Sequence, residues 1–265
     1  MIYVGLDDTD TLDDPGTNQL ARHLVRELAG HYTGRIIIRH QLLEDPRVPC
    51  TKKNGCASLL FERVEKRKRG QNDFFTTGST KPAPANRENS SDPFVLDGTT
   101  ELIAALREVI IPWCPAASDP GLCVTECVPT AVVDWGRRCQ RELVTQSEAR
   151  ELAAEHGIHL EGLGGTEDGV IGALAAVGLM ATRNDGRVVH YGRAGEDWYD
   201  VTGSLAVDEI LDRGVDAVCD VESGSTVDSG TVDVGKRLRP NYRDGRIVLY
   251  ATRREADAWD AVRVT

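Results

Sequence analysis

The sequence predicts a mixed α+β protein: a ferredoxin-like βαββαβ unit followed by a second α/β unit with a glycine-rich loop. Apolar strand-like runs and amphipathic helical stretches alternate in the order β-α-β-β-α-β over roughly the first half of the chain. Further on, a cluster of glycines stands directly before an apolar helical stretch. With 265 residues, the chain has room for one large domain or two modest ones.

Six segments make up the first unit. Residues 2–6 form a short apolar run typical of a buried strand, and residues 18–29 place their apolar side chains on one face of a helix. For the second helix, Thr99 or Thr100 provides an N-cap and Glu101 lies in the first turn. The predicted segments, in order, are strand 2–6, helix 18–29, strand 36–43, strand 57–64, helix 99–111 and strand 122–128.

The second unit is predicted from shorter signals. A helix begins at Ser147 and ends at Gly157, a typical C-cap residue, and residues 170–179 are apolar enough for a buried helix. The remaining predictions are strands at 188–191, 217–221 and 247–252 and a helix at 205–212. We therefore divide the chain into 1–150 and 151–265, with a single interwoven catalytic region as the alternative.

Composition excludes some classes of function. The net charge of −11 argues against a protein whose main task is to coat a nucleic-acid backbone, because that task needs a basic surface. No apolar run reaches the roughly 20 residues that span a bilayer, and the N-terminus lacks a signal peptide. We expect a cytoplasmic protein with no membrane partner.

The seven cysteines do not predict a zinc site. The close pair Cys123 and Cys127 has three intervening residues, whereas a zinc knuckle has two. We expect structural or free thiols.

The acidic stretch GLDDTDTLDD follows the first strand. Like charges this close repel one another, and burial of a carboxylate raises the cost of its ionisation. A hard cation would remove both costs, since Mg²⁺ prefers oxygen ligands. The alternative is a solvated polar turn that leads into a helix. A haloacid dehalogenase phosphatase is disfavoured, because Leu12 stands where its DxDxT or DxDxV motif needs Thr or Val.

The glycine-rich stretch GLGGTEDGVIGALAAVGL could hold phosphate. Its glycines allow close approach of the backbone, and the start of the following helix offers N–H groups and a positive dipole end. The pattern matches neither the P-loop nor the dinucleotide fingerprint, so a tight turn before a core helix is the alternative. A third stretch, PRVPCTKKNG at 46–55, offers two lysines to phosphate, or simply a solvated loop.

Together, these stretches resemble motifs of the archaeal tRNA-Ile 2-agmatinylcytidine synthase family. That family has a GIDDTDS-like loop, a CTTYLA-like segment, a stretch like IPYKTRGNGAVSF and a run like GRGLIGALAAVG. The counterparts here are GLDDTDT at 5–11, GTNQLA at 16–21, VPCTKKNGCAS at 48–58 and DGVIGALAAVG at 168–178, with a weaker match at 240–250. Four matches in the same order are far more specific than any one.

The resemblance implies an ATP- and Mg²⁺-dependent ligase or kinase-like enzyme of tRNA modification. Such an enzyme uses ATP to activate the C2 carbonyl oxygen of an anticodon cytidine, which agmatine then displaces. By the same resemblance, Asp7, Asp8 and Asp10 would hold Mg²⁺, and Thr17 would match the family's phosphorylated threonine. The implied ATP-binding residues are Lys52, Lys53, Asn54, Gly164, Gly165, Gly169 and Gly172.

The resemblance covers the catalytic portion of the family, kinase-like plus ferredoxin-like, without its OB-fold or zinc ribbon. The expected partners are therefore ATP, an acceptor that is either tRNA or a smaller molecule, an amine, and a separate tRNA-binding protein if tRNA is the acceptor. Thr17 could instead cap the helix that begins near Asn18.

The alternative function is a non-catalytic nucleic-acid-binding or regulatory module of the same fold. Its support is the basic run KRKRG at 66–70 and the long polar loop that follows it.

Overall fold

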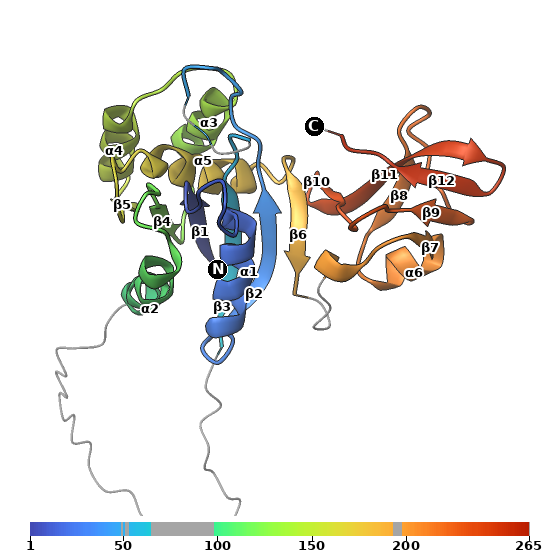
Figure 1. Ribbon diagram of the computed structural model, residues 1–265, viewed down its shortest axis with the longest axis horizontal. Helices are drawn as coiled ribbons and strands as arrows, with labels where there is room; N and C mark the ends of the chain where they lie inside the picture. Colours follow the sequence, from blue (N-terminus) through green and yellow to red (C-terminus); the bar gives the residue numbers. More distant parts are fainter. Residues whose placement is uncertain (49, 51–52, 65–97, 193–197, 265) are drawn as a thin grey trace, which may run out of the picture.

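The computed structural model describes residues 1–48, 50, 53–64, 98–192 and 198–264. The basic run at 66–70 lies outside these residues. One twelve-stranded sheet runs through the described chain, in the order β5-β4-β1-β3-β2-β6-β10-β11-β12-β9-β7, with β8 paired to β11. Figure 1 shows α1 to α5 gathered around the first strands, β6 in the middle, and β7 to β12 with α6 on the far side.

The first part of the sheet has the predicted ferredoxin-like topology. Its order is β4-β1-β3-β2, and each neighbouring pair is antiparallel, as a split βαβ unit requires. The helices α1 and α2 connect these strands and pack against each other. The elements are β1 (Ile2–Asp7), α1 (Thr17–Glu27), β2 (Tyr32–Arg39), β3 (Ala57–Arg63), α2 (Gly98–Trp113) and β4 (Gly121–Thr125).

The next three helices cover the other face of the same sheet, and the strands β5 and β6 extend the sheet beyond β4 and β2. The apolar helix α5 packs on β1 and β4, and α3 and α4 pack on α5. They are α3 (Thr130–Cys139), α4 (Gln146–Glu155), β5 (His159–Gly162), α5 (Gly169–Ala181) and β6 (Arg187–Tyr191). Helix α3 has no counterpart among the predicted elements.

Small residues let α5 approach the sheet closely. A Cβ at Gly5 of β1 would overlap the carbonyl oxygen of Ala173, and one at Gly178 would overlap the carbonyl oxygen of Val132 in α3. Eleven of the thirteen α5 residues are buried, which explains its nearly uniform apolar sequence. The predicted division at residue 150 stays a prediction, but α5 of the second unit lies directly on the strands of the first.

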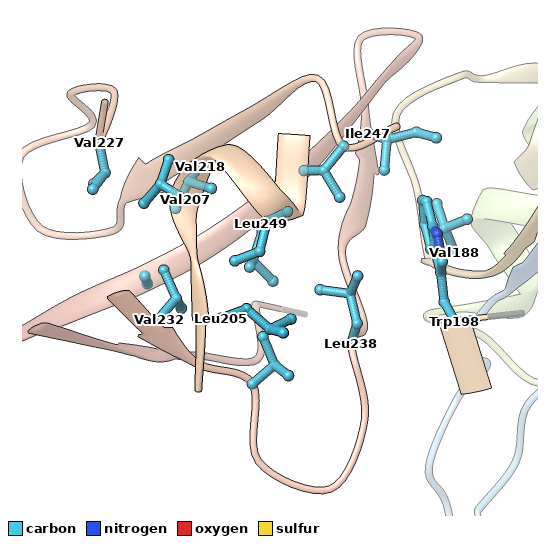
Figure 2. Close-up of a cluster of buried hydrophobic side chains, with 14 of the residues drawn as sticks. Val188, Trp198, Leu205, Val207, Val218, Val227, Val232, Leu238, Ile247 and Leu249 are labelled. Atoms are coloured by element: carbon cyan, nitrogen blue, oxygen red, sulfur yellow. The ribbon is translucent and has the colours of Figure 1, made fainter. Parts of the chain in front are cut away.

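The C-terminal elements have their own core. They are a 3₁₀ turn (Trp198–Asp200), β7 (Ser204–Ala206), α6 (Val207–Asp212), β8 (Ala217–Asp220), β9 (Thr231–Asp233), β10 (Asn241–Arg243), β11 (Arg246–Glu255) and β12 (Ala258–Ala261). Figure 2 shows the buried cluster, with Val227 at one end and Val188 of β6 with Trp198 at the other. Within the described ranges, no helix is long and apolar enough to cross a bilayer.

Candidate functional site

A cavity of about 520 Å³ lies where the acidic loop after β1 meets the start of α5. Its volume lies within the range of small-molecule sites. Eight residues predicted from the sequence line it: Asp7, Asp8, Asp10, Thr17, Lys53, Asn54, Gly169 and Gly172. The structure therefore brings together segments that are more than 150 positions apart in the chain.

The acidic loop has a fixed backbone. Asp8 has a φ of +52°, in the left-handed region that few non-glycine residues adopt. Its carbonyl oxygen accepts a hydrogen bond from the backbone N–H of Asp119, at 3.1 Å, which ties the end of β1 to the loop before β4. The buried Thr9 donates through its hydroxyl to Thr17 Oγ1, also at 3.1 Å. These bonds hold the aspartates between two loops and the start of α1.

Thr17 is the first residue of α1 rather than its cap. The N-cap is Gly16, which has no side chain to accept a hydrogen bond, so a capping role for Thr17 was wrong. Only 8% of Thr17 is exposed, yet the residue lines the cavity. Thr17 is therefore a residue of the site. Its phosphorylation stays a prediction.

The first turn of α5 reaches the aspartates. A Cβ at Gly172 would overlap the carboxylate of Asp7, so only glycine allows this approach. A Cβ at Gly169 would likewise overlap the backbone of Asp119 and Gly121. Both glycines are predicted ATP-binding residues, and the structure places them beside the carboxylates.

The other two predicted glycines lie behind the cavity. Gly164 and Gly165 pack against residues 118–120, and Gly165 has a φ of +58°. They are not among the lining residues of the cavity, but the loop they shape places Thr166 and Asp168 there. The carboxylate of Asp119 accepts a hydrogen bond from the backbone N–H of Thr166, which fixes this loop.

The lysine-containing stretch closes another side of the cavity. Asn54 holds the loop through its side chain, which donates to the carbonyl oxygen of Leu43 at 2.8 Å. Lys53 forms an exposed ion pair with Glu44, at 3.6 Å. The predicted Lys52 lies outside the described residues. Asn54 thus shapes the wall, while Lys53 brings a cation to it.

The carboxylates perturb one another. Burial raises the pKa of Asp7 to about 7, and the charges of Asp8 and Asp10 add to this effect. Burial also raises the pKa of Asp8 to about 6, with further contributions from Asp119, Asp10 and Asp168. Shifts of this kind in a cavity are typical of functional sites, because several like charges have been placed together.

The lining of the cavity combines several carboxylates with apolar side chains. Among the described lining residues, six are carboxylates (Asp7, Asp8, Asp10, Glu142, Asp119 and Asp168) and two are basic (Arg47 and Lys53). Apolar side chains that also line it are Leu42, Leu43, Val48, Leu143, Val144 and Ile171. A ligand with a charged part and an apolar ring would match both kinds of lining side chain.

No three His, Cys, Asp or Glu side chains in the described part of the chain form a ready metal-binding group. The seven cysteines are free thiols, as expected. A cation at the aspartates would therefore need ligands from water or a bound molecule as well. Mg²⁺ commonly binds in this way, through one or two carboxylates plus waters and phosphate oxygens.

Three acidic lining residues of the cavity, Asp119, Glu142 and Asp168, were not predicted. Asp119 precedes β4, which is antiparallel to β1. The start of β4 and the end of β1 therefore lie side by side. The strand order predicted from the sequence already implied that these two strand ends are neighbours. Asp168 stands directly before α5, within the glycine-rich stretch itself.

Comparison with known proteins supports the fold. No protein-family model and no curated protein sequence matches the chain. A solved structure described as a tRNA fluorescent labeling enzyme has a TM-score of 0.50 and 22% identity, over 67% of this chain and 35% of that one. Apo TiaS, the tRNAIle2 agmatidine synthetase, has a TM-score of 0.49 and 21% identity, with the same coverage.

The chain spans about a third of the length of these structures. The TiaS–tRNA(Ile2)–ATP complex is similar to the same extent, with a TM-score of 0.48, 22% identity and 67% of this chain covered. At this identity the likeness is one of fold. The resemblance to this group that the sequence motifs indicated is confirmed at that level.

Proposed function

We propose that this chain is an ATP- and Mg²⁺-dependent transferase or ligase that activates an acceptor oxygen by phosphorylation before an amine attacks. The observation that carries the proposal is the contact between the Asp7 carboxylate and Gly172, which joins the acidic loop to a helix N-terminus inside one cavity. Phosphoryl transfer consists mainly of positioning and charge neutralisation, so carboxylates for a cation and backbone N–H groups for phosphate are the expected parts.

The donor set fits Mg²⁺. Asp7, Asp8 and Asp10 offer carboxylate oxygens, the ligands that this ion prefers. The excess of carboxylates would repel a bare triphosphate, so a cation must accompany an anionic nucleotide. When bound, Mg²⁺ with ATP supplies a phosphoryl group and neutralises the charge that develops on it.

The chain's own residues have three tasks in this proposal. The start of α5, opened by Gly169 and Gly172, offers phosphate oxygens the positive end of the helix dipole, while the backbone N–H groups of Val170 and Ile171 already donate to the carbonyl oxygens of Glu167 and Asp168. Lys53 adds a positive charge to the lining of the cavity. The apolar lining side chains, Leu143 and Ile171 among them, receive the adenine ring and exclude water.

Two classes of molecule could serve as the acceptor. TiaS has been solved with tRNA(Ile2) and ATP, and with tRNA(Ile2), AMPCPP and agmatine. For this chain we propose either tRNA, held together with a separate tRNA-binding protein, or a smaller molecule with an amine as nucleophile. A cytoplasmic location suits both.

Isothermal titration calorimetry of ATP, with and without Mg²⁺, tests the proposal. We expect binding to require Mg²⁺ and to weaken at least tenfold, about 1.4 kcal/mol, in Asp8→Asn and in Asp10→Asn. Asp134→Asn is the matched control, because Asp134 lies on the exposed face of α3 beside Arg137. Equal affinity in the wild type and both loop variants would remove the aspartates from the metal site.

A further inference from the structure

A second cavity, of about 820 Å³, adjoins the first. Five residues line both cavities: Asp10, Thr17, Leu42, Lys53 and Gly55. A molecule in the second cavity would therefore meet a nucleotide in the first at Asp10, Thr17 and Lys53. The volume again falls within the range of small-molecule sites.

The charge of this second cavity is the reverse of the first. Its described lining residues include seven basic side chains, namely Arg39, Lys53, Arg187, Arg237, Arg239, Arg243 and Arg263. Three carboxylates line it, those of Asp10, Glu44 and Asp185. This excess of positive charge occurs in a chain whose net charge is −11. We call this site the arginine cavity.

Two of the carboxylates in the arginine cavity have partners other than the arginines. Asp185 Oδ1 lies 2.6 Å from His40 Nδ1, and its Oδ2 accepts from Gln140 at 3.0 Å. Glu44 forms its ion pair with Lys53. Asp185 also interacts with the charge of Arg243, and Lys53 is itself one of the seven basic side chains, so the three carboxylates offset part of the positive charge but leave an excess.

Strand pairing forces several arginines onto one face. Arg39 at the end of β2 stands directly opposite Arg187 at the start of β6, and Arg187 stands opposite Asn241 of β10. Arg243 lies two residues beyond Asn241 and so points to the same side. Like charges directly opposite on neighbouring strands destabilise a sheet. Such an arrangement is costly unless an anion binds between the strands.

The electrostatics agree with this geometry. Burial lowers the pKa of Arg187, and the charges of Arg263, Arg39, Arg239 and Arg243 lower it further. Five guanidinium groups from four separate segments therefore act on one another. A bound anion would relieve this repulsion.

Phosphate on a small molecule fits better than a nucleic-acid strand. The planar guanidinium group binds phosphate through paired hydrogen bonds. No aromatic side chain occurs among the described lining residues, whereas proteins that hold single-stranded nucleic acid stack bases on aromatic rings. A long polyanion would also meet the acidic remainder of the molecule.

We propose that the arginine cavity binds the phosphate group of a small phosphorylated acceptor, whose reactive oxygen faces the nucleotide at Asp10 and Thr17. This inference rests on the proposed function only where it calls the bound molecule an acceptor. The binding of a phosphorylated small molecule is tested independently of it.

The test titrates ribose 5-phosphate into the protein by calorimetry, without Mg²⁺ or nucleotide. We expect saturable binding that weakens at least tenfold in Arg187→Gln and in Arg243→Gln. Arg137→Gln, an exposed arginine of α3 outside both cavities, is the control and should bind as the wild type does. Thermal melts of each variant check folding, and two separate variants guard against one that fails to fold.

Three further titrations decide the chemistry. Ribose should not bind, and citrate should bind more weakly than ribose 5-phosphate. Tighter binding of citrate, or of a single-stranded RNA decamer that depends on Arg187, would overturn the assignment to a small phosphorylated molecule. Absence of ribose 5-phosphate binding, or an equal loss in Arg137→Gln, would overturn the site itself.

A separate titration with Mg²⁺ and ATP keeps the two proposals distinct. If the nucleotide binds and ribose 5-phosphate does not, only the arginine cavity is wrong. If ribose 5-phosphate binds through Arg187 and the nucleotide does not, the phosphate site stands and the proposed function fails.

Discussion

The carboxylate of Asp7 occupies the space that a Cβ at Gly172 would take. Asp7 ends β1 and Gly172 lies in the first turn of α5, so a single side-chain contact joins the two halves of the candidate site. This contact depends on the absence of a side chain at one position.

Gly172→Ala should lower the free energy of unfolding by about 1–3 kcal/mol, because the added methyl group overlaps the Asp7 carboxylate in a packed region. It should also weaken Mg²⁺–ATP binding, since Asp7 or the helix must move. Urea denaturation and calorimetry measure the two effects. Gly30→Ala is the control, because a Cβ there meets nothing within 4 Å. If Gly30→Ala and Gly172→Ala lost similar amounts of stability and of affinity for Mg²⁺–ATP, the contact between Asp7 and Gly172 would be contradicted.

The raised pKa of Asp7, about 7, predicts an unusual dependence of stability on pH. Between about pH 4 and pH 7 the folded protein keeps a proton on Asp7 that the unfolded chain has lost, so stability falls as the pH rises through this window. Asp7→Asn should flatten the slope and stabilise the protein at pH 8, by on the order of 2 kcal/mol.

Urea denaturation of the metal-free protein at several pH values measures this effect. Asp13→Asn is the control, because Asp13 is an exposed aspartate of the same loop. A slope that Asp13→Asn changes as much as Asp7→Asn does would assign the effect to general charge rather than to Asp7.

Mg²⁺–ATP should raise the melting temperature more at pH 8 than at pH 5.5. Binding of the ion requires ionised carboxylates, and the pKa values of Asp7 and Asp8, about 7 and about 6, leave both groups largely protonated at the lower pH. Thermal melts at the two pH values, each with and without Mg²⁺–ATP, measure the difference. An equal rise at both would argue that these carboxylates do not hold the ion.

His40→Ala should destabilise the protein by about 2 kcal/mol, because it removes the imidazole that hydrogen-bonds both Asp185 Oδ1 and Ser58 Oγ and leaves a cavity in its place. His40 is fully buried and lies between these two groups, at 2.6 Å and 2.8 Å. The exposed His156 supplies the control, His156→Ala. A loss below 0.5 kcal/mol, on the scale of ordinary surface changes, would show that this network contributes little.

Incubation with Mg²⁺–ATP should place phosphate on Thr17, if the residue acts as its counterparts in the resembling family do. Thr17 lines both cavities, so it lies within reach of a nucleotide bound in the first. Mass spectrometry of the peptide that contains Thr17 measures this, with Thr11→Ala as a control that should retain the phosphate. Phosphate that persists in Thr17→Ala would contradict the assignment.

The sequence predicted the ferredoxin-like strand order because each strand and helix of that unit carries its own periodic signal. Helix α3 was missed although the sequence carries its signals. Its buried residues Val132, Trp135, Gly136 and Cys139 follow the i, i+3, i+4, i+7 spacing of an amphipathic helix, and Pro129 stands directly before its first turn. The short strands β7, β9, β10 and β12 were missed for a different reason. Each has three or four residues and is stabilised by its neighbours rather than by local preference.

The aspartates and glycines of the candidate site were predicted from local motifs, whereas the arginine cavity was not. Arg39, Arg187 and Arg243 stand alone in the sequence, more than 50 positions apart in each case. Only strand register brings them together, and register between β2, β6 and β10 is a property of the folded sheet. Asp119 was a different case, because the predicted strand order already placed the start of β4 beside the end of β1.

A crystal structure with Mn²⁺ and a non-hydrolysable ATP analogue tests the central claim most directly. The anomalous signal of the metal should lie against the carboxylates of the loop at residues 7–10, with the triphosphate at the first turn of α5 beside Gly169 and Gly172. Phosphates bound elsewhere, with the metal out of reach of all three aspartates, would contradict the account.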